Sequence, residues 1–193
     1  MSERLPGAAI VETVTTTINS DGTVNCAAMG VEWGDEIIVI KPYRSTRTLR
    51  NLRATGAAVV NLTDDILLFT QAALGDPQPP TRPTATIDGA VLAEACSWRE
   101  VTVEAFDASG PRGWVTTRVV GRGAGREFVG FNRACHAVLE ASIIASRARR
   151  LPSAEIRAEL ERLELVVDKT GGPREREAME LVRRHVRAAV GSG

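Results

Sequence analysis

The sequence predicts an α+β protein, with an antiparallel β-barrel over residues 1–130 and a helical region over residues 131–193. Two observations lead to this prediction. Short runs rich in β-branched and aromatic residues alternate with Gly, Pro and Asp turn signals through the first two thirds of the chain. From residue 132 onward, apolar residues instead recur every three or four positions, the period of an amphipathic helix. Many short strands joined by turns are typical of an antiparallel barrel or sandwich.

Six runs are expected to form strands. The Asp21-Gly22 pair between TTTIN and TVN adds a hairpin signal, because this dipeptide favours the tight turn between antiparallel strands. The six runs are residues 13–18, 36–40, 57–62, 66–70, 98–106 and 114–120.

One helix is expected within the barrel region, at residues 45–56. Ser45 or Thr46 can cap its start, and Gly56 can close its end in the left-handed conformation. Leu49 and Leu52 stand three residues apart and are expected to face the core.

Three helices are expected in the last third of the chain. The first begins at Asn132, a candidate N-cap, and both Asn132 and the adjacent Arg133, which could contact an anion, are candidate cofactor-binding residues. Pro152 and Ser153 start the second helix, residues 170–173 break it, and the third runs from Arg174.

Composition narrows the class of protein. Lys+Arg 24 balance Asp+Glu 24, so the chain lacks the basic excess of a nucleic-acid-binding protein. No apolar run approaches the roughly 20 residues that cross a bilayer, and MSERLPGAAI lacks the layout of a secretory signal. Three cysteines without CxxC spacing, and two distant histidines, predict neither a disulfide framework nor a metal site. A cytoplasmic protein without nucleic-acid or membrane partners is expected.

The segment over residues 41–62 is the most informative about function. A helix N-terminus exposes unpaired N–H groups and the positive end of the helix dipole. Arg44, Ser45, Thr46 and Thr48 add a guanidinium and three hydroxyls, so the segment predicts a site for a phosphate monoester. The alternative is a capped helix with a solvated stripe of arginines.

The same segment carries a resemblance to a known family. TTTINSDGTVNCAAMGVEW, followed by PYRSTRTLRNLRATGAAVVNLTDDILLF, resembles the FMN-binding split-barrel superfamily of flavin reductases. Together with GFNRACHAVLEASIIASR and DKTGGPRERE, these segments are more closely similar to the domain of unknown function 447 family. The resemblance covers nearly the whole chain.

The resemblance implies a split barrel that binds FMN at a homodimer interface, with the helical region packing on the barrel or on that interface. It places the FMN phosphate at Arg44, Ser45, Thr46 and Thr48. The ring is placed along the strand that holds Ala28, Met29 and Gly30, with Asn61 as a polar contact near the flavin. The small side chains of CAAMG fit such a flat, largely apolar slot.

The function expected from these residues is that of an FMN-dependent oxidoreductase of the flavin reductase type, with NADH or NADPH as candidate hydride donors. The alternative is a non-enzymatic flavin- or nucleotide-binding module, which the same phosphate site would serve. No residue is predicted to act as a catalytic acid or base. A dimer is expected because a split barrel exposes an open flank and the helix over residues 138–144 is strongly apolar.

Overall fold

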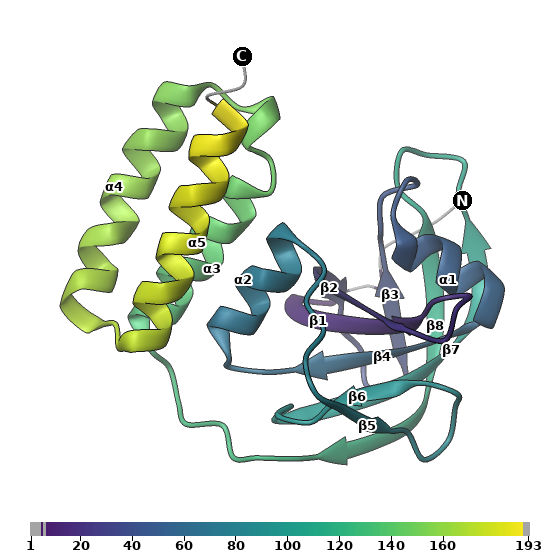
Figure 1. Ribbon diagram of the computed structural model, residues 1–193. Helices are drawn as coiled ribbons and strands as arrows, with labels where there is room; N and C mark the ends of the chain where they lie inside the picture. Colours follow the sequence, from purple (N-terminus) through teal and green to yellow (C-terminus); the bar gives the residue numbers. More distant parts are fainter. Residues whose placement is uncertain (1–4, 6, 191–193) are drawn as a thin grey trace. The chain divides into compact units, whose positions relative to one another are not determined.

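The computed structural model describes residue 5 and residues 7–190, which form two compact units (Figure 1). The first unit holds the described residues up to Thr63 together with Gln78–Glu127. The second holds Asp64–Pro77 and the described residues from Phe128 onward. The second unit therefore draws on an internal segment as well as on the last third of the chain.

The first unit is built on a closed six-stranded antiparallel barrel, which confirms the antiparallel barrel predicted from the sequence. Its strands follow the order β1-β2-β3-β8-β7-β4, and β4 pairs back with β1 to close the ring. The bounds are β1 Ile10–Ile18, β2 Val24–Glu32, β3 Ile37–Ile40, β4 Ala57–Leu62, β7 Ser97–Asp107 and β8 Trp114–Ala124.

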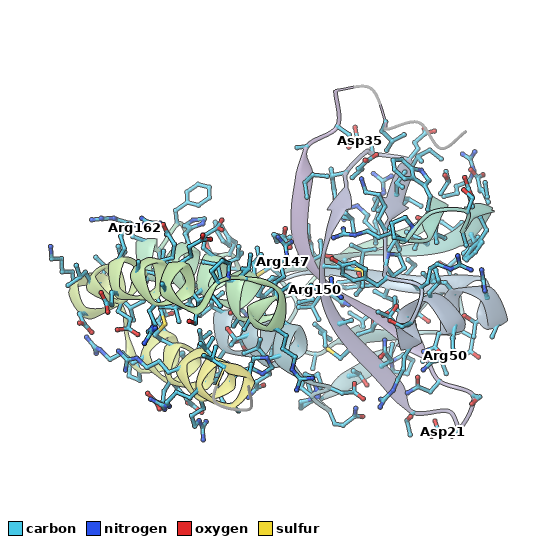
Figure 2. All side chains as sticks on the ribbon, turned by 90° about the horizontal axis from the view of Figure 1, so that it is seen from above. Asp21, Asp35, Arg50, Arg147, Arg150 and Arg162 are labelled. Atoms are coloured by element: carbon cyan, nitrogen blue, oxygen red, sulfur yellow. The ribbon has the colours of Figure 1, made fainter. Side chains whose placement is uncertain are left out.

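The long β1–β2 hairpin sets the length of the barrel. Gly22 in its turn has φ +82°, a conformation that favours glycine, and the Asp21 carboxylate accepts hydrogen bonds from the Thr23 backbone and hydroxyl. These bonds lower the pKa of Asp21. Asp21 and Asp35, in the turns that precede and follow β2, lie at opposite ends of the unit (Figure 2).

The barrel core is apolar and includes one face of helix α1 (Arg47–Thr55). Leu49 and Leu52, 2% and 1% exposed, pack with core side chains of the strands, as their spacing predicts. Gly56 has φ +67° and closes the helix, with its N–H donated to the Leu52 carbonyl. The strand side chains of this core are Val31, Ile38, Ile40, Ala58, Val60, Val101 and Val115.

A small second sheet, β5 (Thr81–Pro83) with β6 (Ala90–Leu92), belongs to the same unit and was not predicted from the sequence. The loop between its strands is fixed by Glu100 of β7. The Glu100 carboxylate accepts hydrogen bonds from the N–H groups of Ala85 and Thr86, at 3.1 and 2.7 Å. The loop between the two strands is thereby held by a carboxylate 14 to 15 residues further along the chain.

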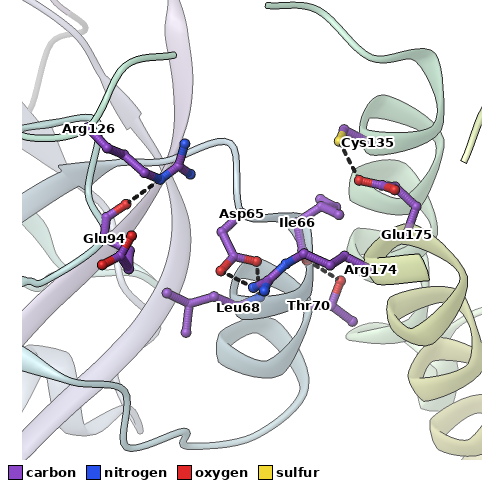
Figure 3. Close-up of polar contacts among 9 residues, drawn as sticks. All are labelled: Asp65, Ile66, Leu68, Thr70, Glu94, Arg126, Cys135, Arg174 and Glu175. Atoms are coloured by element: carbon purple, nitrogen blue, oxygen red, sulfur yellow. Dashed lines mark hydrogen bonds and ion pairs between the residues drawn. The ribbon is translucent and has the colours of Figure 1, made fainter. Parts of the chain in front are cut away.

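The second unit is helical, and one of its helices corrects a prediction. Residues 66–70, expected to be a strand, lie in α2 (Ile66–Leu74). Asp65 caps this helix by accepting the Leu68 N–H, and Arg174 pairs with the same side chain (Figure 3). A short apolar run does not distinguish a strand from a buried helix, so the cap and the packing decide.

The other helices of this unit follow the prediction. They are α3 (Arg133–Ala145), α4 (Ser153–Thr170) and α5 (Pro173–Val190), with the short 3-10 turn η1 (Ala148–Arg150). On α4, the apolar residues Ile156, Leu160 and Leu163, which recur at helical spacing, are all buried. None of the helices in the described part of the chain is both long and apolar enough to span a membrane.

Two arguments for a dimer lose their basis in the structure. The barrel closes through the β1–β4 pairing and leaves no unpaired flank between these strands. Val138 and Ala141, within the apolar helix over residues 138–144, are 0% exposed inside the helical unit. α3 packs there on α2, α4 and α5.

Candidate functional site

The start of α1 is held in a defined turn. Thr46 is the N-cap: its hydroxyl donates to the Tyr43 carbonyl at 2.8 Å and accepts the Leu49 N–H at 3.4 Å. Gly113, the residue before β8, supports this turn by donating its N–H to the Pro42 carbonyl at 2.9 Å. Glycine is required there, because a Cβ at position 113 would lie 2.4 Å from Leu49 Cδ1. Of the two predicted caps, Thr46 is the one used.

Arg44 and Ser45 lie just before this cap, and both are exposed. Within the described part of the chain, neither side chain has a hydrogen-bond or ion-pair partner; only the Ser45 carbonyl is used, by Arg50. A guanidinium and a hydroxyl are therefore available beside a helix N-terminus. This donor set suits a phosphate monoester.

Arg112 is a nearby cation that sequence reasoning missed. It forms an isolated β-bridge with Tyr43, donates to the Tyr43 hydroxyl at 2.8 Å and lies 4.4 Å from the centre of its ring. The bridge joins positions 69 residues apart. No local pattern signals such a pairing.

Thr48 points away from the start of the helix. It is 2% exposed, and its hydroxyl accepts a hydrogen bond from the Asn25 amide at 3.1 Å. Asn25 and Asn51 both donate to Thr17, which joins α1 to the β1–β2 hairpin. Thr48 thus positions the helix, while Arg44, Ser45 and Thr46 surround its N-terminus.

The three predicted residues of β2 do not share a face. Met29 packs against the barrel core, so its neighbours Ala28 and Gly30 lie on the outer face of the strand. All three are half-buried. Gly30 is covered by β1, since a Cβ there would lie 2.7 Å from Ile10 Cγ2 and 2.8 Å from Glu12 Oε1.

Asn61 is 0% exposed, and its amide makes an internal set of hydrogen bonds. Its nitrogen donates to the Val14 carbonyl at 3.0 Å and to the Thr16 hydroxyl at 3.2 Å. Its oxygen accepts the Leu92 N–H at 3.0 Å. Asn61 therefore ties β1, β4 and β6 together, and a flavin contact for it stays a prediction.

Asn132 and Arg133 belong to the helical unit. The Asn132 side chain caps α3 as predicted, accepting the Ala134 N–H at 2.7 Å, and Arg133 is exposed. The structure thus brings Arg44, Ser45 and Thr46 together in the barrel unit. A cofactor contact for Asn132 and Arg133 stays a prediction.

Cys135 of α3 is held as a thiol. Burial, followed by its hydrogen bond to the Glu175 carboxylate at 3.3 Å, raises the pKa of Cys135 to about 12 (Figure 3). A nucleophilic cysteine needs a lowered pKa, so this environment is the reverse of an activating one. Among the described residues, no group of three or more His, Cys, Asp or Glu side chains is arranged to hold a metal ion.

Comparison with solved structures shows the fold class of the chain. An FMN-bound protein from Methanosarcina mazei, assigned to the DUF447 family, is similar with a TM-score of 0.78 at 21% identity, over 92% of this chain and 95% of that one. The flavin reductase of styrene monooxygenase from Pseudomonas putida S12 matches with a TM-score of 0.52 at 18% identity, over 62% of this chain and 82% of its own. An NADH:FAD oxidoreductase from Streptomyces globisporus matches with a TM-score of 0.52 at 12% identity, over 63% and 87%. The barrel is therefore of the FMN-binding split-barrel type.

Comparison with family models covers most of the chain. Residues 11–125 match the N-terminal domain of a family described as a protein of unknown function, DUF447. Residues 132–184 match the second model of the same family. The chain belongs to the DUF447 family.

Proposed function

We propose that the barrel unit binds FMN, with the phosphate at the start of α1. The observation that carries this proposal is the pair of exposed side chains of Arg44 and Ser45 beside the Thr46 cap, which have no partner among the residues that the structure describes. A helix N-terminus with an adjacent guanidinium is complementary to a phosphate in charge and in hydrogen-bond donors. The FMN bound to the Methanosarcina mazei protein supports the choice of ligand.

The flavin ring would lie along the outer face of β2. Ala28 presents a small, half-buried side chain there, and Gly30, whose outer face is covered by Ile10 and Glu12 of β1, would contribute through its backbone. Small side chains permit the close backbone approach that a flat ring requires. Met29 would contribute through its backbone, because its side chain is directed to the core.

FMN is favoured over FAD on the same residues. The donors at the start of α1 suit one phosphate group, and the sequence shows no motif for an adenosine. FMN, when bound, supplies hydride and electron transfer, while the protein binds and orients the ring. Because the flavin would supply the redox chemistry, the protein need not supply an activated acid, base or thiol.

The proposed activity is that of a flavin reductase-type oxidoreductase, with NADH or NADPH as the hydride donor. The flavin reductase from Pseudomonas putida and the NADH:FAD oxidoreductase from Streptomyces globisporus support this class. A non-enzymatic flavin-binding module is the second candidate. The donors at the start of α1 would serve it equally well, because they bind the phosphate whether or not the flavin is reduced.

We also propose a cytoplasmic homodimer with the flavin at its interface. Phe128, Val129 and Phe131 are 48%, 88% and 89% exposed, and Phe128 packs edge to face on Phe131. An exposed apolar cluster of this kind marks an interaction surface. Light scattering at low micromolar concentration should give twice 20.7 kDa, and a mass of 20.7 kDa would contradict the dimer.

The free cysteines in the described chain support the proposed location in a reducing compartment such as the cytoplasm.

The absorption spectrum of the purified protein tests cofactor binding, and chromatography of the extracted cofactor separates FMN from FAD. FMN is expected; predominant FAD, or no flavin after reconstitution, would contradict the proposal. Anaerobic addition of NADH or NADPH then separates the two functions. Bleaching of the bound flavin supports an oxidoreductase, and an unchanged spectrum with both nucleotides supports the binding module.

A further inference from the structure

Two arginines face each other across neighbouring strands of the barrel. Arg99 of β7 and Arg122 of β8 are directly paired in the strand register. Side chains at paired positions lie on the same face of a sheet, with Cβ atoms about 4.5–5.5 Å apart, and like charges at such a pair destabilise the sheet. The pair therefore has a cost to the fold.

Among the described residues, no carboxylate forms an ion pair with either arginine. Within the described residues, Arg99 donates to the Trp98 carbonyl at 2.9 Å and Arg122 to the Asp35 carbonyl at 3.0 Å, and neither forms an ion pair. Arg118, four residues before Arg122 on the same strand, is in contrast paired with the Glu104 carboxylate. The exposed Asp35 carboxylate attracts Arg99 electrostatically but forms no ion pair with it.

Arg99 is also held in a partly dry environment. Arg99 is paired with Val60 of β4, whose side chain belongs to the barrel core. The Arg99 side chain therefore starts on the inner face of the sheet. The guanidinium carbon lies 5.3 Å from the centre of the Trp33 ring. Burial, and then repulsion from Arg122, lowers the pKa of Arg99, with a smaller opposing effect from Asp35. A partly desolvated cation gains more from an anion than a fully solvated one does.

We propose that Arg99 and Arg122 form a binding site for an oxyanion with at least two negative charges, supplied by a phosphate-bearing ligand or by a dicarboxylate. A guanidinium has five N–H donors, and each of these two makes one hydrogen bond within the described chain. The remaining donors suit the oxygens of a phosphate or of carboxylates. An anion with two or more charges would also turn the repulsion between the arginines into attraction to a shared ligand.

The oxyanion site is separate from the one proposed for FMN. Arg122 donates a hydrogen bond to the Asp35 carbonyl, just before β3 begins, whereas the start of α1 follows the other end of β3, where Tyr43 bridges to Arg112. The labels of Asp35 and Arg50 show these two ends of the barrel unit (Figure 2). FMN binding and oxyanion binding therefore fail or succeed independently.

Calorimetric titration of the full-length chain with inorganic pyrophosphate, and in parallel with malonate, tests the site. Saturating FMN is present throughout, so that the titrated anion does not compete for the donors at the start of α1. Arg122→Gln and Arg99→Gln are expected to weaken binding of the preferred anion at least tenfold. Arg118→Gln, which removes an arginine of the same strand that is already paired with Glu104, is expected to leave it within about twofold. Preference for pyrophosphate identifies a phosphate-bearing ligand, and preference for malonate identifies a dicarboxylate.

Thermal unfolding gives a second measurement on the same variants. Without anion, Arg122→Gln is expected to melt at the same temperature as the wild type or higher, since the repulsion is removed. The preferred anion should raise the melting temperature of the wild type and not that of the variant. Failure of both anions to bind at millimolar concentration would overturn the proposal, as would equal losses in Arg118→Gln and Arg122→Gln. Because Arg122 is exposed, its variant carries the test if Arg99→Gln does not fold.

Discussion

Replacing Arg44 by alanine should weaken FMN binding without weakening the fold. In the described chain the Arg44 side chain is exposed and has no partner, so its removal breaks no contact of the apo-protein. A charge-assisted contact to phosphate contributes about 1.5–3 kcal/mol, which corresponds to roughly ten- to hundredfold in affinity. The melting temperature should stay unchanged, because the loss is confined to the complex.

Arg50→Ala is the matched control on the same helix. The backbone of Arg50 lies more than a turn from the cap, and its guanidinium reaches back to donate to the Ser45 carbonyl at 3.1 Å, so Arg50 supports the turn and is expected to contribute less to the phosphate than Arg44 does. Its loss should change affinity by about twofold, and Ser45→Ala should fall between the two, at about two- to tenfold. Flavin fluorescence titration of the apo-proteins measures all three. If Arg50→Ala is the most damaging while its melting curve is unchanged, the phosphate does not lie at the start of α1.

Three further predictions concern stability and reactivity. Asn61→Leu leaves the buried Leu92 N–H without its acceptor and should lower the free energy of unfolding in urea by about 1–3 kcal/mol; an unchanged midpoint would show that Asn61 does not anchor β6. Glu100→Gln should destabilise the chain at pH 7. Burial raises the pKa of the Glu100 carboxyl, but hydrogen bonds from Ala85 and Thr86 outweigh it and the net shift is downward. The stabilisation from the Glu100 carboxylate is therefore complete above the unfolded pKa and is lost as pH falls below about 4. The free energies of unfolding of wild type and variant should converge in acid. A difference that stays constant with pH would contradict this. Cys135, with a pKa of about 12, should be alkylated slowly by iodoacetamide at pH 8, and Glu175→Gln should speed the reaction. Mass spectrometry of the labelled peptide measures both rates. Equal rates would refute the influence of Glu175.

The sequence was sufficient wherever a local signal determines the structure. Thr46 and Gly56 end α1 because a hydroxyl cap and a left-handed glycine act within one turn of the chain. The apolar faces of α4 and α5 were predictable because their period of three to four residues is sustained over 18 residues in each helix. In these elements the local preference and the final packing agree.

The structure differs from the prediction where distant contacts decide. The apolar run of α2 suited a strand equally well, and its helical state depends on the Asp65 cap and on burial against other helices. β5 and β6 depend on Asn61 and Glu100, which lie outside the segment they order. A sheet built from such remote partners leaves no periodic signal in its own short strands.

In the candidate site, too, the features set by local contacts were predictable from the sequence and those set by distant contacts were not. The position of Arg44 and Ser45 before the helix cap followed from the sequence, because the cap is local. The burial of Thr48 did not, because its partner Asn25 lies on β2, 23 residues away. The side of β2 to which Met29 points depends on strand register, and a shift of one residue would have reversed it.

The most direct test of the account compares FMN with riboflavin, which lacks the phosphate, in titrations of the same apo-protein. The account predicts that FMN binds with one site per chain and roughly ten- to hundredfold more tightly than riboflavin, with the difference lost in Arg44→Ala. Equal affinities for FMN and riboflavin in the wild type, or no binding of either, would contradict an FMN phosphate site at the start of α1.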